Sequence, residues 1–247
     1  MQKKSLFYYG INLIVTVFLA LLFGGVLGAM GGNELFSGLI ITMGVQLAPL
    51  ISFCIYKKKY NPEKHYTCDF NIWSLAAIII PVVLIVSSSL ILSLTDVKFI
   101  PTEYKGFLFA AAIITTAIGC TAEELGWRGC LLPIFEEKHS KLTSALYTGL
   151  LWGAWHFFKI SSIGITGYFL FIPSIIVFSI IMSYIFNKSN RSIVNMSIFH
   201  CFINFSTIIM LYERECIQFY IILFIISLIF LAILYIKDYS FWRKEML

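Results

Sequence analysis

The stretch that decides the fold runs from Gly106 to Phe135 and reads GFLFAAAIITTAIGCTAEELGWRGCLLPIF. Its charged side chains are Glu123, Glu124 and Arg128. Such a segment predicts a membrane-crossing helix, because about 20 apolar residues span the hydrocarbon core of a bilayer. Each charged side chain at mid-bilayer costs roughly 2.5–3.5 kcal/mol on insertion scales. Three of them therefore indicate a place where chemistry or pairing offsets that cost.

The rest of the chain has the same character. Of its 247 residues, 59% are apolar and 13% are charged, and the mean hydropathy is +0.87. Soluble domains carry about 25% charged residues. The composition therefore predicts a single polytopic membrane domain over residues 1–247, an all-α bundle of about eight helices. The expected stretches are Leu6–Ala29, Leu35–Tyr56, Trp73–Leu94, Gly106–Phe135, Leu142–Phe158, Gly167–Phe186, Ile193–Leu211 and Cys216–Ile236.

Two of these stretches depart from the ideal length. Leu142–Phe158 is short for a crossing, whereas Gly106–Phe135 is too long for one perpendicular helix. Proline removes a hydrogen bond from a helix interior and kinks or breaks it. Pro133 is therefore expected to divide the fourth stretch into a spanning part and an interfacial part.

The connecting segments predict the orientation. If all eight stretches cross, thirteen Lys and Arg residues lie on the side of the two termini and four lie on the other side. Cytoplasmic connections carry the excess of Lys and Arg, so both termini are expected in the cytoplasm. Topology and anionic lipid explain the net charge of +5, so nucleic acid is not expected as a partner. The first stretch is longer than the 7–15 apolar residues of a signal peptide and is expected to stay in the mature protein.

The cysteines show no C-x-x-C spacing, and most fall in apolar stretches. Free, buried thiols are therefore expected. The six positions are Cys54, Cys68, Cys120, Cys130, Cys201 and Cys216.

Polar residues inside the predicted helices gather in three places, and the first is Thr121–Gly129. Glu124 and Arg128 are four residues apart, with the acid on the N-terminal side, which favours an ion pair on a helix. Glu123 points about 100° away and lacks that partner. A carboxyl without a charged partner in a low dielectric can hold a proton near neutral pH, as a general acid or base requires. A purely structural cluster that pins this helix to a neighbour would use the same residues.

The second place is Leu151–His156, and the third is Phe199–Asn204. Trp152 lies one helical turn before His156 and could orient its imidazole, although both residues are also typical of helix packing. His200 and Asn204 are four apart and share a helical face. Their N–H groups suit an oxyanion, but this spacing alone is weak. Together, the three places supply the parts of a hydrolytic site.

The order E-E-x-x-x-R, W-x-x-x-H and H-x-x-x-N on three apolar stretches resembles the CPBP family of intramembrane proteases. This family contains the type 2 CAAX prenyl proteases and many bacterial proteins linked to bacteriocin immunity. The resemblance covers roughly residues 110–205, and the core protease-like region is expected at about 106–211. The second motif more often begins with Phe, where this chain has Trp152.

The resemblance implies an intramembrane endopeptidase whose polar cavity opens toward the cytoplasm. It implies that Glu123 and His156 activate a water and that His200 and Asn204 stabilise the oxyanion. Glu124 and Arg128 are then expected to support the first glutamate.

No cofactor is favoured. If a metal is bound, Glu123, His156 and His200 are the candidate ligands of Zn²⁺, but no H-E-x-x-H helix is present. A metal-free glutamate mechanism uses the same residues.

One geometric conflict follows from helix lengths. The fifth and seventh stretches both start on the expected cytoplasmic side. With a rise of about 1.5 Å per residue, His200 lies about 10 Å from the start of its helix, whereas His156 lies about 21 Å from Leu142, the start of the fifth stretch. The two cannot share a site unless the fifth helix tilts or starts outside the membrane boundary.

Two other functions stay open. The chain could be a non-catalytic scaffold or immunity protein, or a small proton- or cation-coupled transporter. No internal repeat of the kind that many transporters show is visible. Abundant Ile, Phe, Lys and Asn suggest a bacterial cell membrane, where the substrate is expected to be a membrane-associated peptide, prenylated or bacteriocin-like. The sequence leaves the oligomeric state open.

Overall fold

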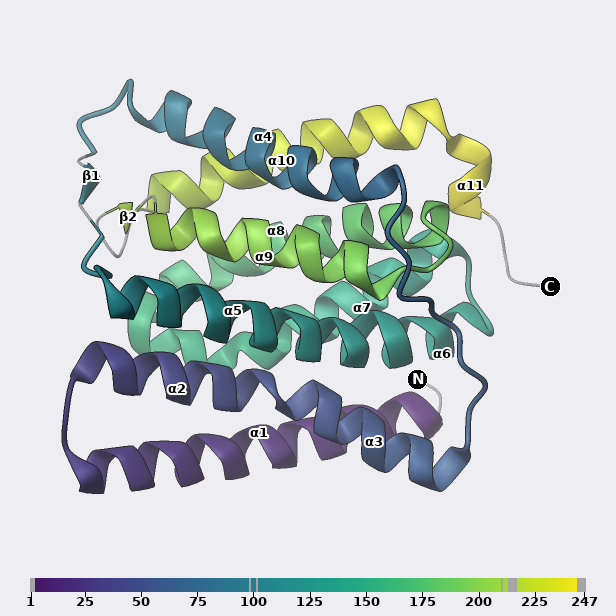
Figure 1. Cartoon of the computed structure of the whole chain (residues 1–247). Helices are drawn as coiled ribbons and strands as arrows, with labels where there is room; N and C mark the ends of the chain where they lie inside the picture. Colours follow the sequence, from purple (N-terminus) through teal and green to yellow (C-terminus); the bar gives the residue numbers. More distant parts are fainter. Residues whose placement is uncertain (1–2, 98, 101, 210, 213–216, 244–247) are drawn as a thin grey trace.

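The computed structural model describes residues 3–97, 99–100, 102–209, 211–212 and 217–243. There the chain forms a bundle of long helices (Figure 1), and the predicted all-α membrane fold is confirmed. The helical elements are α1 (Lys3–Met30), α2 (Glu34–Gln46), α3 (Ala48–Tyr60), α4 (Trp73–Leu92), α5 (Phe107–Gly126), a π-helical turn (Trp127–Leu131), α6 (Leu132–Glu136), α7 (Lys141–Trp155), a 3₁₀ turn (His156–Lys159), α8 (Ile160–Lys188), α9 (Ile193–Ile209), α10 (Ile217–Lys237) and α11 (Tyr239–Arg243).

Six helical stretches of the described residues are long and apolar enough to cross a membrane. One of them, Lys141–Lys188, is a hairpin, because α7 and α8 pack against each other in opposite directions. Ser179 Oγ donates to the carbonyl of Ala145 over 3.1 Å, and Tyr168 Oη reaches the carbonyl of Gly153 over 3.3 Å. The chain turns at Gly164, whose φ of 69° favours glycine. Helix α9 is apolar but shorter than these six stretches. With the hairpin counted as two crossings and α9 as one, the eight predicted stretches correspond to eight passes through the bundle.

Helix α1 shows how the bundle faces its surroundings. Its buried positions recur every three or four residues and are mostly polar: Ser5, Tyr8, Asn12, Thr16 and Leu19. Its exposed positions include large apolar side chains such as Ile14 and Leu21, which are 70% and 72% exposed. A polar interior with an apolar exterior is the pattern expected of a helix in lipid, where polar side chains face the bundle.

The fourth predicted stretch remains one helical unit, so the expected division at Pro133 is wrong. Helix α5 passes through the π-helical turn directly into α6, and the Leu132 N–H bonds to the carbonyl of Trp127, five residues back. Pro133 lies in the first turn of α6, where a missing N–H costs least. The wider turn and the position of Pro133 together let the chain continue from α5 into α6.

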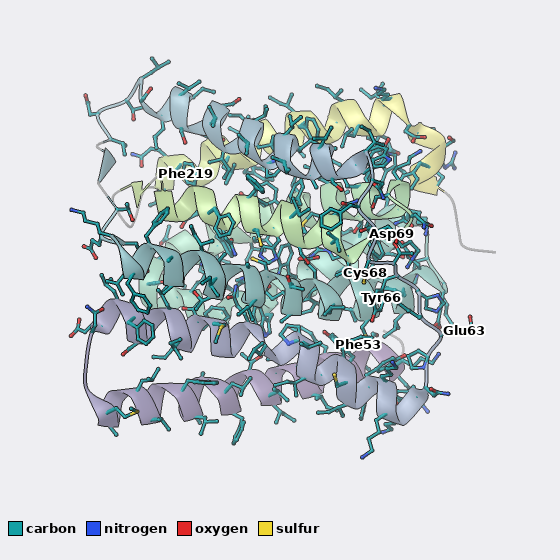
Figure 2. The ribbon with its side chains drawn as sticks, in the orientation of Figure 1. Phe53, Glu63, Tyr66, Cys68, Asp69 and Phe219 are labelled. Atoms are coloured by element: carbon teal, nitrogen blue, oxygen red, sulfur yellow. The ribbon has the colours of Figure 1, made fainter. Side chains whose placement is uncertain are left out.

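The two ends of the bundle differ. The start of α1, the α3–α4 connection, the α8–α9 turn and α11 lie at one end, on the right in Figure 1. At the other end, Phe99–Ile100 (β1) pairs antiparallel with Leu211–Tyr212 (β2), a two-residue pairing that the sequence did not predict. Figure 2 shows Glu63, Tyr66 and Asp69 of the α3–α4 connection at the first end. The start of α1 and the end of α11 thus lie on the same side, as eight crossings require.

A further acid is buried at the first end of the bundle, outside the predicted stretch that holds Glu123 and Glu124. Glu136 ends α6 and is 1% exposed. Its carboxylate pairs with Arg191 over 2.7 Å and with Lys141 over 3.2 Å. Backbone hydrogen bonds of 3.0 Å join Thr67 to Arg191 and to Ile193. These contacts fasten the α3–α4 connection to the turn that leads into α9.

The expectation for the cysteines is met in part. Cys120, Cys130 and Cys201 are free and buried, whereas Cys54 and Cys68 are free and exposed. Cys54 lies on a face of α3 that other helices do not cover, and Cys68 lies in the α3–α4 connection. Cys216 is outside the described residues.

Candidate active site

The first motif lies deep in the bundle. Glu123 is 1% exposed, and Glu124 and Arg128 are fully buried. The two acids are in the last turn of α5, and Arg128 follows in the π-helical turn. Such turns inside α-helices are frequent at functional sites.

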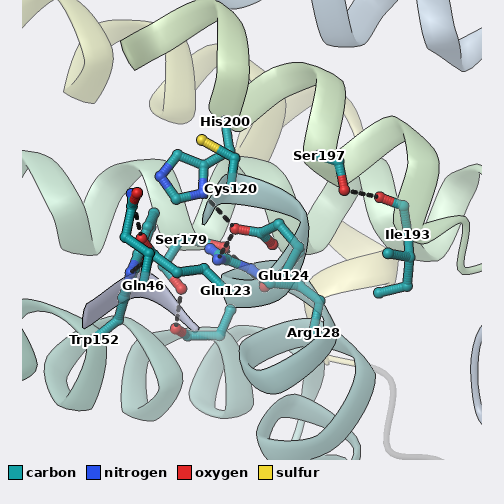
Figure 3. A network of polar contacts seen from close by, with 12 residues as sticks. Gln46, Cys120, Glu123, Glu124, Arg128, Trp152, Ser179, Ile193, Ser197 and His200 are labelled. Atoms are coloured by element: carbon teal, nitrogen blue, oxygen red, sulfur yellow. Dashed lines mark hydrogen bonds and ion pairs between the residues drawn. The ribbon is translucent and has the colours of Figure 1, made fainter. Parts of the chain in front are cut away.

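Glu124 is the paired acid, as the spacing predicts. Its Oε1 lies 2.9 Å from Arg128 Nη1 and 2.9 Å from His200 Nδ1 (Figure 3). One carboxylate thus joins α5 to α9 and to the π-helical turn. The contact to His200 was not predicted, because the spacing along one chain does not show which helices are neighbours.

Glu123 has no ion pair within the described residues, which agrees with the prediction, but it has two neutral partners. Gln46 Nε2 donates to Oε1 over 2.9 Å, and Trp152 Nε1 donates to Oε2 over 2.9 Å (Figure 3). Sequence reasoning missed Gln46. The available signal was an amide side chain inside the apolar stretch Leu35–Tyr56, since polar residues within membrane spans mark functional positions.

Trp152 lies at the centre of the site, in contact with residues from all three motifs. The Arg128 guanidinium lies 4.4 Å from the centre of the indole ring. The centroids of the His200 and His156 rings lie 5.2 Å and 5.7 Å from the indole centroid. With its N–H bond to Glu123, this side chain touches four of the residues that the three motifs single out.

The tautomer of neutral His156 follows from its hydrogen bond. Its Nδ1 lies 2.8 Å from the carbonyl oxygen of Trp152. A carbonyl only accepts, so Nδ1 carries the proton and Nε2 is left as an acceptor. The ring is 6% exposed and packs against Trp155 and Phe171, with centroids 5.0 Å and 5.3 Å away. Neutral His156 therefore presents a basic nitrogen within an aromatic shell.

Two expectations about the histidines are changed by the structure. His200 and Asn204 share a face of α9, but they bond different partners: His200 reaches Glu124, and Asn204 Nδ2 donates to Cys120 Sγ over 3.3 Å. In the part of the chain that the structure describes, no hydrogen bond joins His156 to Glu123 or to His200. His200 meets α7 at Trp152, one turn before His156. Both imidazole rings nevertheless pack against the same indole, with centroids 5.7 Å and 5.2 Å away, so Trp152 joins the two histidines.

The three candidate metal ligands each have a hydrogen-bond partner in the protein. Among the described residues, no group of three or more His, Cys, Asp or Glu side chains is arranged to hold a metal ion. Both oxygens of Glu123 accept N–H donors, and the Nδ1 atoms of His156 and His200 are already bonded. The Nε2 atoms of both histidines are not engaged by these bonds, so each imidazole keeps one nitrogen that could ligate a metal ion.

Two comparisons with known proteins agree with the motifs. The family model described as type II CAAX prenyl endopeptidase Rce1-like matches residues 105–206. CAAX prenyl protease 2 of Methanococcus maripaludis is 27% identical over 200 residues, which cover 70% of this chain and 73% of the relative. These matches confirm the resemblance to the CPBP family. With the six apolar helical stretches, they support an integral membrane protease of the CAAX type.

Proposed function

We propose that this protein is an intramembrane endopeptidase in which Glu123 and His156 activate water to cleave a membrane-associated peptide. The observation that carries the proposal is the Glu123 carboxyl, which is 1% exposed and has hydrogen bonds from two neutral donors. Among the described residues, the ion pairs of this site engage Glu124 and not Glu123. A buried carboxyl in that state suits proton transfer, whereas the neighbouring Glu124 is engaged by Arg128 and His200.

Water activation needs a base that accepts a proton and a second group that orients the nucleophile. Glu123 is the proposed base, and Nε2 of neutral His156 is the proposed acceptor for the other water proton. Trp152 links the two groups, because its N–H bonds to Glu123 and its carbonyl accepts from His156. General base catalysis of this kind contributes typically about 10²–10⁴ in rate.

The tetrahedral intermediate needs hydrogen-bond donors at its oxyanion. His200 and Asn204 remain the proposed donors, but His200 donates from Nε2 only as an imidazolium, because its Nδ1 faces Glu124. The Glu124 carboxylate favours that charged form. Glu124 and Arg128 therefore act on the reaction through His200 as well as through the helix that carries Glu123. Protonated Glu123 then gives its proton to the leaving amine as the C–N bond breaks, so that the carboxylate is restored.

The substrate is proposed as a peptide held at the membrane, prenylated or bacteriocin-like, that enters from the end of the bundle where α1 begins and α11 ends. That end carries most of the basic residues in the connections, and the positive-inside rule makes it the cytoplasmic one. The name of the archaeal relative supports a CAAX tail as the first substrate to test.

The test is cleavage of quenched fluorescent peptides by the purified protein in liposomes. The peptides are a farnesylated C-terminal peptide, its unmodified form and a bacteriocin precursor peptide. We expect cleavage of at least one of them by the wild type and none by Glu123→Ala. A folded wild type that cleaves none, and that protects cells from a bacteriocin equally well with Glu123→Ala, would favour the immunity scaffold. Proton-coupled uptake that is lost in Glu123→Ala would favour the transporter.

A further inference from the structure

Gln46 reaches Glu123 from an interruption between two helices. Helix α2 ends at Gln46 and α3 begins at Ala48, with Pro49 in its first turn. Tyr8 Oη donates to the Pro49 carbonyl over 3.2 Å. This bond fixes α1 to the interruption, at the level where α5 passes.

A glycine on α5 makes room for the amide. A Cβ at Gly119 would overlap the carboxamide of Gln46. Gly119 precedes Glu123 by four residues, so both face the same neighbour on the helix. The Gln46 side chain therefore lies along α5 from Gly119 to the carboxyl group of Glu123.

Gln46 and Trp152 hold one oxygen of Glu123 each, from two different helices, α2 and α7. Gln46 Nε2 lies 2.9 Å from Oε1, and Trp152 Nε1 lies 2.9 Å from Oε2. Two donors at two oxygens block rotation of the carboxyl group about its last side-chain bond. A carboxylate accepts at both oxygens, so neither N–H donor is left without an acceptor.

We propose that Gln46 is a positioning residue that fixes the Glu123 carboxylate in a single orientation for proton transfer, and that Gly119 lacks a side chain so that Gln46 can reach it. The effect on turnover rests on the proposed function of Glu123. The orientation itself does not, so the two can be tested separately.

The kinetic test replaces Gln46 with methionine, which has a similar volume and no N–H donor. Because a misplacement of about 1 Å can cost about a hundredfold in rate, we expect kcat to fall between about tenfold and a hundredfold. KM should remain that of the wild type, since Gln46 is proposed to contact Glu123 and not the peptide. A merely structural role would instead lower the fraction of active protein, which active-site titration measures, and would leave the kcat of the remaining active fraction at the wild-type value.

A double-mutant cycle tests the part that Gly119 plays. Gly119→Ala should lower kcat about as much as Gln46→Met does, because the new Cβ displaces the amide. In the Gln46→Ala background, Gly119→Ala should cost little more, since the side chain to be displaced is gone. Gly38→Ala, on the same helix as Gln46 and with no atom within 4 Å of the new Cβ, is the matched control and should leave kcat unchanged.

Fluorine NMR of protein labelled with 5-fluorotryptophan gives a readout that needs no proteolysis. The Trp152 resonance is identified by its loss in Trp152→Phe. Because Trp152 shares the Glu123 carboxylate with Gln46, we expect its resonance to shift in Gln46→Met and in Gly119→Ala but not in Gly38→Ala. A Trp152 resonance that stays at the wild-type position in folded Gln46→Met overturns the proposal, whether or not a substrate is cleaved. A shifted resonance with no cleavage by the wild type counts against the proposed function alone.

Discussion

Nε1 of Trp152 donates to Oε2 of Glu123 over 2.9 Å, and this bond joins α7 to α5 in the centre of the bundle. The carbonyl of the same tryptophan accepts from His156 Nδ1. Trp152 thus sets the position of Glu123, the proposed base, and the tautomer of His156, the proposed acceptor of the other water proton. The family motif more often has Phe at this position, which would keep the ring contacts and lose the N–H.

Trp152→Phe is therefore the first informative variant. The packing against His156 and His200 should remain, while Oε2 of Glu123 loses its donor. An unsatisfied buried acceptor costs about 1–3 kcal/mol, so we expect a lower melting temperature and a clear loss of turnover. Thermal unfolding and peptide cleavage measure the two effects. Full activity in this variant would show that Gln46 alone positions the carboxylate.

Glu123→Gln and His156→Ala test the proposed catalytic pair. Each should reduce hydrolysis by about 10²–10⁴-fold, the contribution typical of general acid–base catalysis. Glu123→Gln should also melt slightly earlier, because its NH₂ group would face an N–H donor of Gln46 or Trp152. Both proteins should still insert and elute as the wild type does in size-exclusion chromatography. Near-wild-type turnover in folded Glu123→Gln would contradict the catalytic role.

The parts of the structure that depend on one helix could be predicted from the sequence. Segment lengths and hydropathy predicted the eight passes, and the spacing of Glu124 and Arg128 predicted their ion pair. The bond from Gln46 to Glu123 joins residues 77 positions apart, so it depends on which helices pack together. No local pattern contains that information. The π-helical turn was missed because the sequence shows the proline but not the backbone register that accommodates it.

The Glu124–Arg128 pair can be tested by removing its cation. Arg128→Ala leaves a buried carboxylate that keeps only His200 as a charged partner. Breaking a buried pair costs about 3–5 kcal/mol, so the melting temperature and the membrane yield should fall together with activity. Arg128→Lys keeps the charge but loses the planar guanidinium over Trp152, and it should lie between Arg128→Ala and the wild type. Equal melting temperatures for Arg128→Ala and the wild type would disprove the structural role of the pair.

An ion pair outside the membrane-spanning stretches predicts a weak acid dependence of stability. Lys188 Nζ lies 2.5 Å from Asp238 Oδ2, and this hydrogen bond holds the pKa of Asp238 below its ordinary value of 3.8. A carboxyl with a lowered pKa stabilises the fold above its ordinary pKa. This contribution is lost as the pH falls through the folded value. Melting curves between pH 6 and pH 3, taken as approximate limits, should thus differ less for Asp238→Asn than for the wild type. The difference should be small, because partly exposed ion pairs contribute little.

Metal dependence separates two mechanisms that share the same residues. Both carboxylate oxygens of Glu123 accept N–H donors, so we predict that prolonged treatment with a strong chelator leaves cleavage intact and that elemental analysis finds no stoichiometric zinc. Asn204→Ala supplies a matched variant, since an amide is a poor zinc ligand but a good oxyanion donor. Its turnover should fall about 10²–10³-fold, the cost of removing one such donor. Loss of activity on chelation, with recovery on adding Zn²⁺, would replace the glutamate mechanism with one in which zinc lowers the pKa of its bound water to about 7.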